Sequence, residues 1–387
     1  MFGEVYDGSD AKCGSYTGTR AGGPFELDSV VDYPLYFRIN DVFARATGNT
    51  RQLEDHYAAI PANYDSTAAM RLVTFLDNHD QPRFLSSGNA GNNLQRLRLA
   101  LVFLYTARGI PCLYYGTEQG FNGGNDPYDR EDMFAGQFEQ GPSLGDNFNM
   151  THPLFQWVAR LNNFRRLYPA LQTGEHSNLW NDPNGPGLFA YSRRLATNSA
   201  GGPRTQEVFV VLNTANANQT LTGRPSSHPA GTRLVNLLDP RERITIVAGP
   251  QTPSITVSGT SAKVFVAEAQ VRPLDPVVTG VTPAHDSRQD AGESARLPIV
   301  LRFSKPMDTG SVEAAFSTVP TVAGSFAWSP SHDTMSFTPN AQGFPARTMV
   351  TLRLDAGAKD AVSSNTLCAA FESRFETLSA DANAAGK

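Results

Sequence analysis

The first part of the chain alternates two kinds of hydrophobic pattern. Continuous apolar runs predict buried strands at 72–76 and 109–116. Apolar residues that recur every three or four positions predict helices at 34–48, at 93–108 and from Pro153 onward. Because strands that are apolar along their whole length are buried on both faces, this alternation predicts parallel strands in an α/β architecture.

Two of these helices show the periodic pattern most clearly. In the helix at 93–108, the apolar positions expected to face the core are Leu94, Leu97, Leu101 and Leu104. In the helix that begins near Pro153, they are Leu154, Trp157, Val158, Leu161 and Phe164. Gly109 follows the first helix directly and is expected to end it.

The pattern changes near residue 186. Short runs rich in valine, isoleucine and aromatic residues, separated by turn residues, predict an antiparallel β-domain that ends near Glu268. After a proline-bearing linker, similar runs recur with one helical turn near 312–316, which predicts an immunoglobulin-like sandwich. The expected boundaries are 1–175 for the α/β part, 176–268 for the β-domain, 269–278 for the linker and 279–378 for the Ig-like domain.

Composition excludes several classes of protein. The chain has 387 residues, of which 40% are hydrophobic and 18% charged, as in globular domains. A net charge of −5 argues against a nucleic-acid partner or an anionic membrane surface, since both require a basic face. No apolar run is long enough to span a bilayer, and the opening MFGEVYDG has no signal-peptide pattern. Three widely spaced cysteines, Cys13, Cys112 and Cys368, predict neither a disulfide framework nor a zinc site.

Polar clusters follow both predicted strands. The strand at 72–76 ends in Asp77, Asn78, His79 and Asp80, and the strand at 109–116 is followed by Thr117, Glu118 and Gln119. In α/β folds, the carboxyl ends of the parallel strands form the face that carries the active site. The sequence therefore predicts chemistry at these strand ends.

Four sequence blocks resemble one enzyme family. FLDNHD at 75–80 resembles the fourth conserved region of the α-amylase superfamily, glycoside hydrolase family 13, and GEVYDG at 3–8 resembles its third region. GIPCLYYGTEQG at 109–120 is similar to the segment around barrel strand eight. GNDPYDRE at 124–131 is similar to the loop that reaches donor-side sugars in amylases and cyclodextrin glucanotransferases. The blocks follow the family's order, and the similarity extends from Phe2 to about Glu268.

The resemblance implies a role for each site residue. Glu4 would be the general acid/base, and Asp80 would be the carboxylate that stabilises the oxocarbenium-like transition state. The residues expected to bind sugar are Asn78, His79, Asp126 and Arg130. Glycosidic cleavage needs an acid that protonates the leaving oxygen, and a retaining enzyme needs a second carboxylate as nucleophile about 5 Å away. A further carboxylate beside them would help to keep the pKa of the acid raised.

Structural roles compete with these assignments. Glu4 could be an exposed acid near the chain terminus, and Asp80 could cap a helix. Asp126 and Arg130 could form only a loop ion pair. Asp7 and Glu118 are expected to be structural partners. Tyr114 and Tyr115 are expected to be mainly barrel core, although a ring at the mouth of the barrel could stack on a sugar.

The nucleophile of the family is not recognisable in this sequence. The family carries it as an aspartate in a G-F-R-x-D motif upstream of the acid/base, whereas Glu4 is the fourth residue here. The nearest imitation, YFRIND at 36–41, has Asn40 in place of the aspartate and lies within a helical pattern. The resemblance therefore implies an incomplete (β/α)8 barrel, about strands five to eight, followed by an antiparallel β-sandwich and an Ig-like β-sandwich. We expect the C-terminal part of an extracellular or cell-surface enzyme, with little activity alone.

The leading interpretation is a retaining glycoside hydrolase that cleaves α-1,4 bonds in starch-like α-glucans. A cyclodextrin glucanotransferase-like transglycosylase is the main alternative, followed by a non-catalytic carbohydrate-binding or surface protein and by an interaction protein built around the Ig-like domain. No cofactor or metal site is visible in the sequence, and calcium is expected only in the missing N-terminal half. The stretch S-K-P-M-D at 304–308 resembles a bacterial Ig-like domain, in which Trp328 is expected to be a core residue, not a sugar-stacking one.

Overall fold

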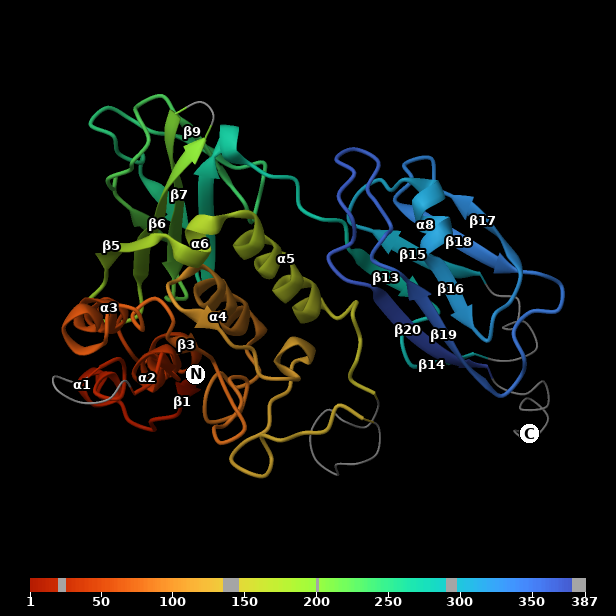
Figure 1. The fold of residues 1–387 in the computed structure, drawn as a ribbon, viewed down its shortest axis with the longest axis horizontal. Helices are drawn as coiled ribbons and strands as arrows, with labels where there is room; N and C mark the ends of the chain where they lie inside the picture. The colour runs from red at the N-terminus through yellow and green to blue at the C-terminus, as the bar shows by residue number, and fades with distance from the viewer. Residues whose placement is uncertain (20–25, 135–145, 200–201, 290–297, 378–387) are drawn as a thin grey trace. The chain divides into compact units, whose positions relative to one another are not determined.

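The computed structural model describes residues 1–19, 26–134, 146–199, 202–289 and 298–377. These residues form two compact units, each of which is described by itself (Figure 1). The first unit contains the described residues up to 131 together with 164–272. The second contains 132–134, 146–163 and 273–377.

Four short strands of the first unit run parallel in chain order. They are β1 (Phe2–Gly3), β2 (Ser29–Val30), β3 (Val73–Thr74) and β4 (Ile110–Pro111). β1 pairs with β2 and β3 pairs with β4, and a parallel bridge between Val31 and Val73 joins the two pairs. The strands predicted at 72–76 and 109–116 are confirmed in position and direction, although each ladder is only two residues long. The expectation of parallel strands in the α/β part is thus confirmed.

Helices connect these strands. They are α1 (Asp10–Gly14), α2 (Tyr33–Ile39), the π-helix η1 (Asn40–Ala44), α3 (Arg51–Asn63), α4 (Leu94–Thr106) and the short 3-10 helix η2 (Thr117–Gln119). The helices predicted at 34–48 and 93–108 are confirmed, and side-chain caps fix where they begin. The Asp32 carboxylate accepts from Leu35 N at 3.1 Å, and Asn93 Oδ1 accepts from Arg96 N at 3.1 Å.

One residue of the predicted apolar face of α4 points to solvent. Leu94, the first residue of the helix, is 50% exposed, so its assignment to the core is wrong. Its N-terminal position explains the exposure, since it lies before the turn at which the helix meets its neighbours. The other three leucines are buried as predicted.

The antiparallel β-domain follows α5 (Pro153–Leu167) and α6 (Pro169–Thr173). Its six-stranded sheet has the order β10-β9-β12-β7-β6-β5. The strands are β5 (Glu175–Asn181), β6 (Leu188–Ser199), β7 (Gly202–Asn213), β9 (Arg233–Asn236), β10 (Arg243–Thr245) and β12 (Ser261–Ala267). β8 (Gln219–Leu221) and β11 (Ile255–Val257) form a separate antiparallel pair, and the 3-10 helix η3 (Glu268–Gln270) ends the domain.

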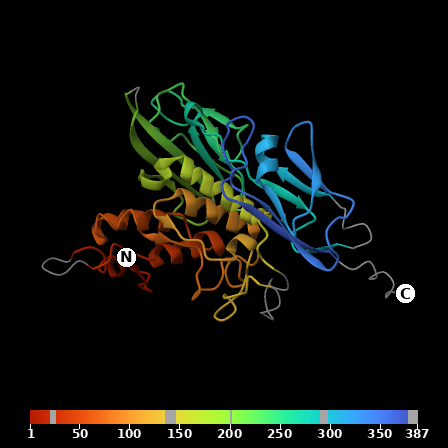
Figure 2. The ribbon, with the colours of Figure 1, turned by 45° about the vertical axis from the view of Figure 1, so that its right-hand side comes forward.

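Helix α4 packs on this sheet beside the parallel strands (Figures 1 and 2). The Phe103 ring lies 6.3 Å from both the Phe189 and the Tyr191 rings. The Tyr191 hydroxyl and Thr106 Oγ1 are hydrogen-bonded at 2.6 Å. The first unit therefore has a continuous core from the helices of the α/β part into the antiparallel sheet.

The second unit contains an antiparallel β-sandwich. One sheet has the order β13-β15-β18-β17 and the other the order β14-β20-β19-β16. The elements are β13 (Val278–Thr282), β14 (Ser287–Gln289), β15 (Ile299–Phe303), α8 (Thr309–Ala315), β16 (Phe316–Val319), β17 (Gly324–Trp328), β18 (Thr334–Pro339), β19 (Thr348–Leu354) and β20 (Phe371–Thr377). Of the strands named here, β14 pairs in parallel, with β20, and the other pairs are antiparallel. The predicted Ig-like sandwich and its helical turn are confirmed.

Trp328 belongs to the core side of this sandwich. Its ring stacks on Phe303 with a centroid distance of 6.1 Å and packs against the buried cluster. Its indole Nε1 donates to Glu313 Oε1 at 2.9 Å. Trp328, expected to be a core residue, is half-buried and packs against the core from its edge. No helix in the described part of the chain is both long and apolar enough to cross a membrane.

Candidate active site

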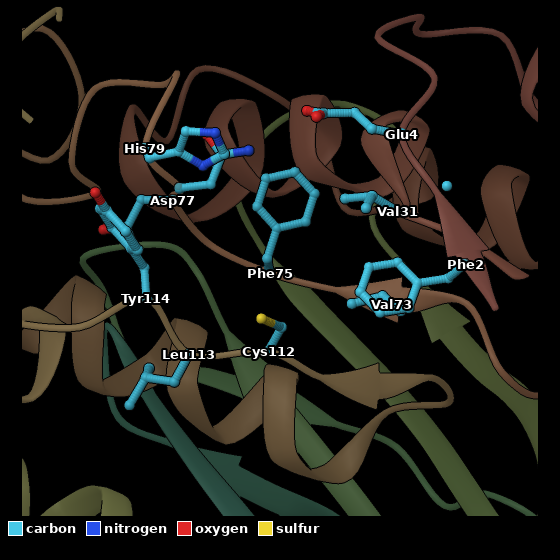
Figure 3. A pocket seen from close by; sticks show the side chains of 12 residues that line it. Phe2, Glu4, Val31, Val73, Phe75, Asp77, His79, Cys112, Leu113 and Tyr114 are labelled. Carbon is cyan, nitrogen blue, oxygen red and sulfur yellow. The ribbon is translucent and has the colours of Figure 1, made fainter.

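The residues that follow the four parallel strands line one cavity of about 370 Å³ (Figure 3). Each strand contributes at its carboxyl end: Glu4 after β1, Val31 after β2, Phe75 after β3 and Cys112 after β4. This cavity lies at the strand ends, where the sequence predicts chemistry. The lining includes the apolar side chains Phe2, Val31, Val73, Phe75 and Leu113, and the polar side chains of Glu4 and His79 lie on the same side of the view in Figure 3.

Glu4 lies at this rim and is exposed to solvent. Its Oε1 accepts a short hydrogen bond from the hydroxyl of Tyr33, a buried residue at the start of α2. Tyr33 Oη in turn accepts from Asn78 Nδ2 at 3.0 Å. Burial, followed by the contact with Glu4, raises the pKa of the Tyr33 hydroxyl, so Tyr33 stays protonated and donates.

The segment after β3 brings three predicted site residues to the cavity region. Asn78 and His79 line the cavity, and the Asp80 backbone N donates to Asn78 Oδ1 at 3.0 Å. His79 Nε2 lies 3.3 Å from Asp80 Oδ2. Asp80 itself is not among the lining residues and lies in a turn, not at a helix N-terminus, so the helix-cap alternative for Asp80 is wrong.

Arg130 joins the loop at 124–131 to this segment. Its Nη2 donates to Asp80 Oδ1 at 3.1 Å, and its Nε donates to the His79 carbonyl at 2.8 Å. The same Nε lies 3.2 Å from Asp126 Oδ1. The two acids and the arginine thus form one partly exposed network beside the cavity, which is more than an isolated loop ion pair.

A buried layer supports the strand end and the loop. Asp77 accepts from Phe84 N at 2.9 Å and from Thr117 Oγ1 at 3.0 Å, and burial raises its pKa. Arg83 Nε donates to Glu131 Oε2 at 2.9 Å, and both side chains are buried. Since Asp77, Arg83 and Glu131 are not at the surface, their role is to hold the segments that carry the exposed residues.

Tyr114, Tyr115 and Asp7 are expected to have structural roles, and the structure shows where each of them lies. Arg83 lies over the Tyr114 ring, 4.0 Å from its centroid, and Tyr114 lines the cavity. Tyr115 is 40% exposed, so its assignment to the core is wrong, although one face of its ring lies 5.0 Å from Arg83 and its carbonyl accepts from Arg83 at 2.6 Å. Asp7 accepts from Ser9 N at 2.8 Å, which is the structural role expected of it.

Sequence reasoning did not find Tyr33. The same strand-end rule would have found it, because Tyr33 follows β2 as Glu4 follows β1. However, β2 is two residues long, Ser29–Val30, and has no apolar run that predicts a strand. Among the described residues, no group of three or more histidine, cysteine, aspartate or glutamate side chains is placed to hold a metal ion.

A glutamate, an amide and a histidine that meet at one cavity are side chains that glycoside cleavage could use, since it needs a carboxylic acid to protonate the glycosidic oxygen. Residues 1–166 match the family model of the alpha amylase catalytic domain, and residues 274–377 match that of a bacterial Ig-like domain. In its first part, the chain belongs to the α-amylase family, and it carries a bacterial Ig-like domain further on.

Curated relatives agree with this family. The Beta/alpha-amylase of Paenibacillus polymyxa is 36% identical over 269 residues, which are 68% of this chain and 19% of the relative. Alpha-amylase 1 of Lipomyces kononenkoae is 33% identical over 42% of this chain and 23% of the relative. A cyclomaltodextrin glucanotransferase of Bacillus licheniformis is 31% identical over 53% of this chain and 25% of the relative. The chain therefore spans about a quarter or less of the length of these relatives.

Solved structures share the fold. An alpha-amylase from Malbranchea cinnamomea aligns with a TM-score of 0.54 and 25% identity, over 70% of this chain and 50% of that chain. A gamma-CGTase from alkalophilic Bacillus clarkii aligns with a TM-score of 0.53 over 97% of this chain and 48% of that chain. At 19% identity, the second likeness concerns the fold alone.

Proposed function

We propose that this chain carries the acid/base part of a retaining glycoside hydrolase of the α-amylase type, which cleaves α-1,4-glucosidic bonds in starch-like polysaccharides. One observation carries the proposal: Glu4, Asn78 and His79 meet at one cavity although they come from different strand ends. A carboxylic acid at the rim of a cavity can protonate a glycosidic oxygen, and an amide and an imidazole beside it can bind sugar hydroxyls.

In this proposal, each site residue has a distinct task. Glu4 donates its proton to the leaving oxygen and later takes a proton from the attacking group. His79 and Asn78 bind the sugar at the cleavage point, while Asp126 and Arg130 bind a more distant sugar. Asp80, which Arg130 holds at 3.1 Å, stabilises positive charge that develops on the sugar ring.

The nucleophile is not among the residues that line the cavity. Among the described residues of the lining, the only carboxylate besides Glu4 is Asp77, which is buried and accepts hydrogen bonds from Phe84 N and Thr117 Oγ1. The sequence also contains no G-F-R-x-D segment. We therefore propose that β1 to β4 correspond to strands five to eight of an eight-stranded barrel, and that the 387-residue chain has little or no glycosidase activity alone. The full-length protein would be extracellular or at the cell surface.

Transglycosylation is the second candidate. It is favoured by the similarity to cyclomaltodextrin glucanotransferases, of which one is 31% identical over 53% of this chain. A hydrolase and a transglycosylase differ in whether water or a sugar hydroxyl attacks the glycosyl-enzyme, and this requires the acceptor side of the site. A carbohydrate-binding protein without catalysis would retain the sugar contacts and would not need Glu4.

The test combines a cleavage assay and a binding assay. We expect the purified chain to release no reducing ends from soluble starch and to bind maltoheptaose weakly by calorimetry. The variants His79→Ala and Arg130→Ala should weaken this binding, whereas Arg241→Ala, which removes an exposed arginine of the β-domain, should not. Starch cleavage that disappears in Glu4→Gln would refute the expected inactivity. An absence of maltoheptaose binding would refute an α-glucan substrate.

A further inference from the structure

Tyr33 is held rigidly next to the site. It is fully buried, and its ring makes edge contacts with Phe75 at a centroid distance of 5.2 Å and with Tyr6 at 5.0 Å. Tyr36 lies on the same helix, α2, with its ring 5.8 Å away. Because several rings fix its plane, the Tyr33 hydroxyl has a defined position beside Glu4.

The hydrogen bonds around Tyr33 have one direction only. The Asp80 backbone N can only donate, so Asn78 Oδ1 is the atom that accepts from it at 3.0 Å. The other side of the amide, Asn78 Nδ2, must then donate to Tyr33 Oη, at 3.0 Å. The Tyr33 proton is left to point at Glu4 Oε1. The chain of donors thus leads from the FLDNHD segment to the glutamate.

We infer that Tyr33 is the positioning residue of Glu4. By donating to the Tyr33 hydroxyl, Asn78 fixes the direction in which that hydroxyl donates. Since Oε1 of Glu4 already accepts from Tyr33, the proton of a protonated Glu4 resides on Oε2. Oε2 is therefore the oxygen that delivers the proton to a leaving group. The inference deepens the proposed function and rests on it for the role of Glu4. It also gives Asn78 a second task beyond sugar binding.

A neighbouring tyrosine provides a matched control. Tyr36 is also buried, and its ring stacks on Phe75 with a centroid distance of 4.8 Å. Its hydroxyl donates to Gln81 Oε1 at 3.4 Å and not to Glu4. Tyr33→Phe and Tyr36→Phe each remove one hydroxyl from the same aromatic cluster, so a general loss of packing would affect both variants alike.

The first measurement does not require turnover. Crystal structures of the full chain with Tyr33→Phe and with Tyr36→Phe report the position of the Glu4 carboxylate. We expect Glu4 to leave its position or to occupy several rotamers in Tyr33→Phe, and to keep its position in Tyr36→Phe. A Glu4 carboxylate that stays in place in Tyr33→Phe would overturn the inference, whatever the activity of the chain.

The second measurement separates proton delivery from folding. Azide is added as an external nucleophile in place of the missing carboxylate. It attacks C1 of the sugar while the bond from C1 to the leaving group breaks, and a sugar leaving group takes the proton of Glu4. Maltoheptaose needs that proton, whereas maltosyl fluoride, which leaves as fluoride, needs little acid assistance. In Tyr33→Phe, we expect azide-dependent cleavage of maltoheptaose to fall about 10- to 100-fold and that of maltosyl fluoride to fall less than about threefold. Tyr36→Phe should leave both rates unchanged.

The outcomes distinguish the inference from the function on which it rests. Equal loss with both substrates in Tyr33→Phe would make Tyr33 a merely structural residue and overturn the inference. If the unchanged chain cleaves neither substrate with azide, the crystallographic position of Glu4 in the two variants decides whether Tyr33 holds it.

Discussion

The buried ion pair between Arg83 and Glu131 allows a quantitative prediction about how the site is supported. Arg83 is fully buried and Glu131 is 1% exposed, and they meet at 2.9 Å. Glu131 also accepts from the Asn122 backbone N at 2.9 Å, so it fixes the start of the loop that carries Asp126 and Arg130. The perturbation is Glu131→Gln, which preserves the shape of the side chain and removes its charge.

The expected cost follows from burial. Removing one partner of a buried pair leaves an uncompensated charge and destabilises a protein by about 3–5 kcal/mol. In a unit of this size, each kcal/mol lowers the Tm by about 2–4 °C, so Glu131→Gln should lower the Tm of the first unit by about 6–20 °C. The assay is differential scanning calorimetry, in which the transition of the second unit, which contains neither residue, serves as a reference.

An exposed pair gives the matched control. Glu268 is 39% exposed and lies 2.8 Å from Arg243 Nε. Water and salt screen such surface pairs, so Glu268→Gln should lower the Tm far less than Glu131→Gln does. The double variant Arg83→Met with Glu131→Leu should be less destabilised than Glu131→Gln, because no charge stays buried without a partner. Equal shifts for Glu131→Gln and Glu268→Gln would refute the reasoning.

Three further predictions concern titration and packing. His56 is fully buried, and its Nδ1 lies 2.7 Å from Asp10 Oδ1 and its Nε2 3.1 Å from Asp32 Oδ2. Burial alone would lower the pKa of His56, but the two carboxylates outweigh burial and raise the pKa. The stabilisation that protonated His56 provides should be complete below a pH of about 6.5 and should disappear as the pH rises through the folded-state pKa. The free energy of unfolding, measured with urea between pH 6 and 9, should therefore fall more steeply with pH in the wild type than in His56→Gln. Parallel curves for the two proteins would contradict this. Asp360 is buried, which raises its pKa, but hydrogen bonds from Ser363 and Val362 outweigh burial and lower the pKa to about 2. Its stabilisation of the second unit should be present above its unfolded pKa and be lost as the pH falls towards 2, and Asp360→Asn should flatten that acid limb. Trp328→Phe removes the 2.9 Å hydrogen bond to Glu313 and should lower the free energy of unfolding by about 1 kcal/mol. The affinity for maltoheptaose should not change, and a lower affinity would identify Trp328 as a sugar contact.

Periodicity predicted the helices whose buried face is made of apolar side chains. α4 and α5 are of this kind, and both occur where the pattern placed them. α3 was not predicted, because its buried positions, Leu53, His56, Tyr57 and Ile60, include an imidazole and a phenol. Burying His56 is favourable only because two carboxylates from other elements contact it, and no local pattern contains that information.

The sequence by itself determined where the polar clusters lie along the chain. Apolar runs that end in polar clusters predicted the strand ends, and the blocks around Glu4 and Asp80 led to the α-amylase family. The apolar pattern did not predict β1 and β2, since neither lies in a long apolar run as β3 and β4 do, and only the family resemblance implied a strand before Glu4.

Only the tertiary structure decided which side chains act on one another. Tyr33 joins Glu4 across 29 positions and Asn78 across 45 positions of the chain, and Arg130 reaches Asp80 across 50. The physical reason is that a hydrogen bond or an ion pair depends on distance and direction in space. These are set by the way in which the strands and helices pack, while the sequence pattern sets only which residues are available at each strand end.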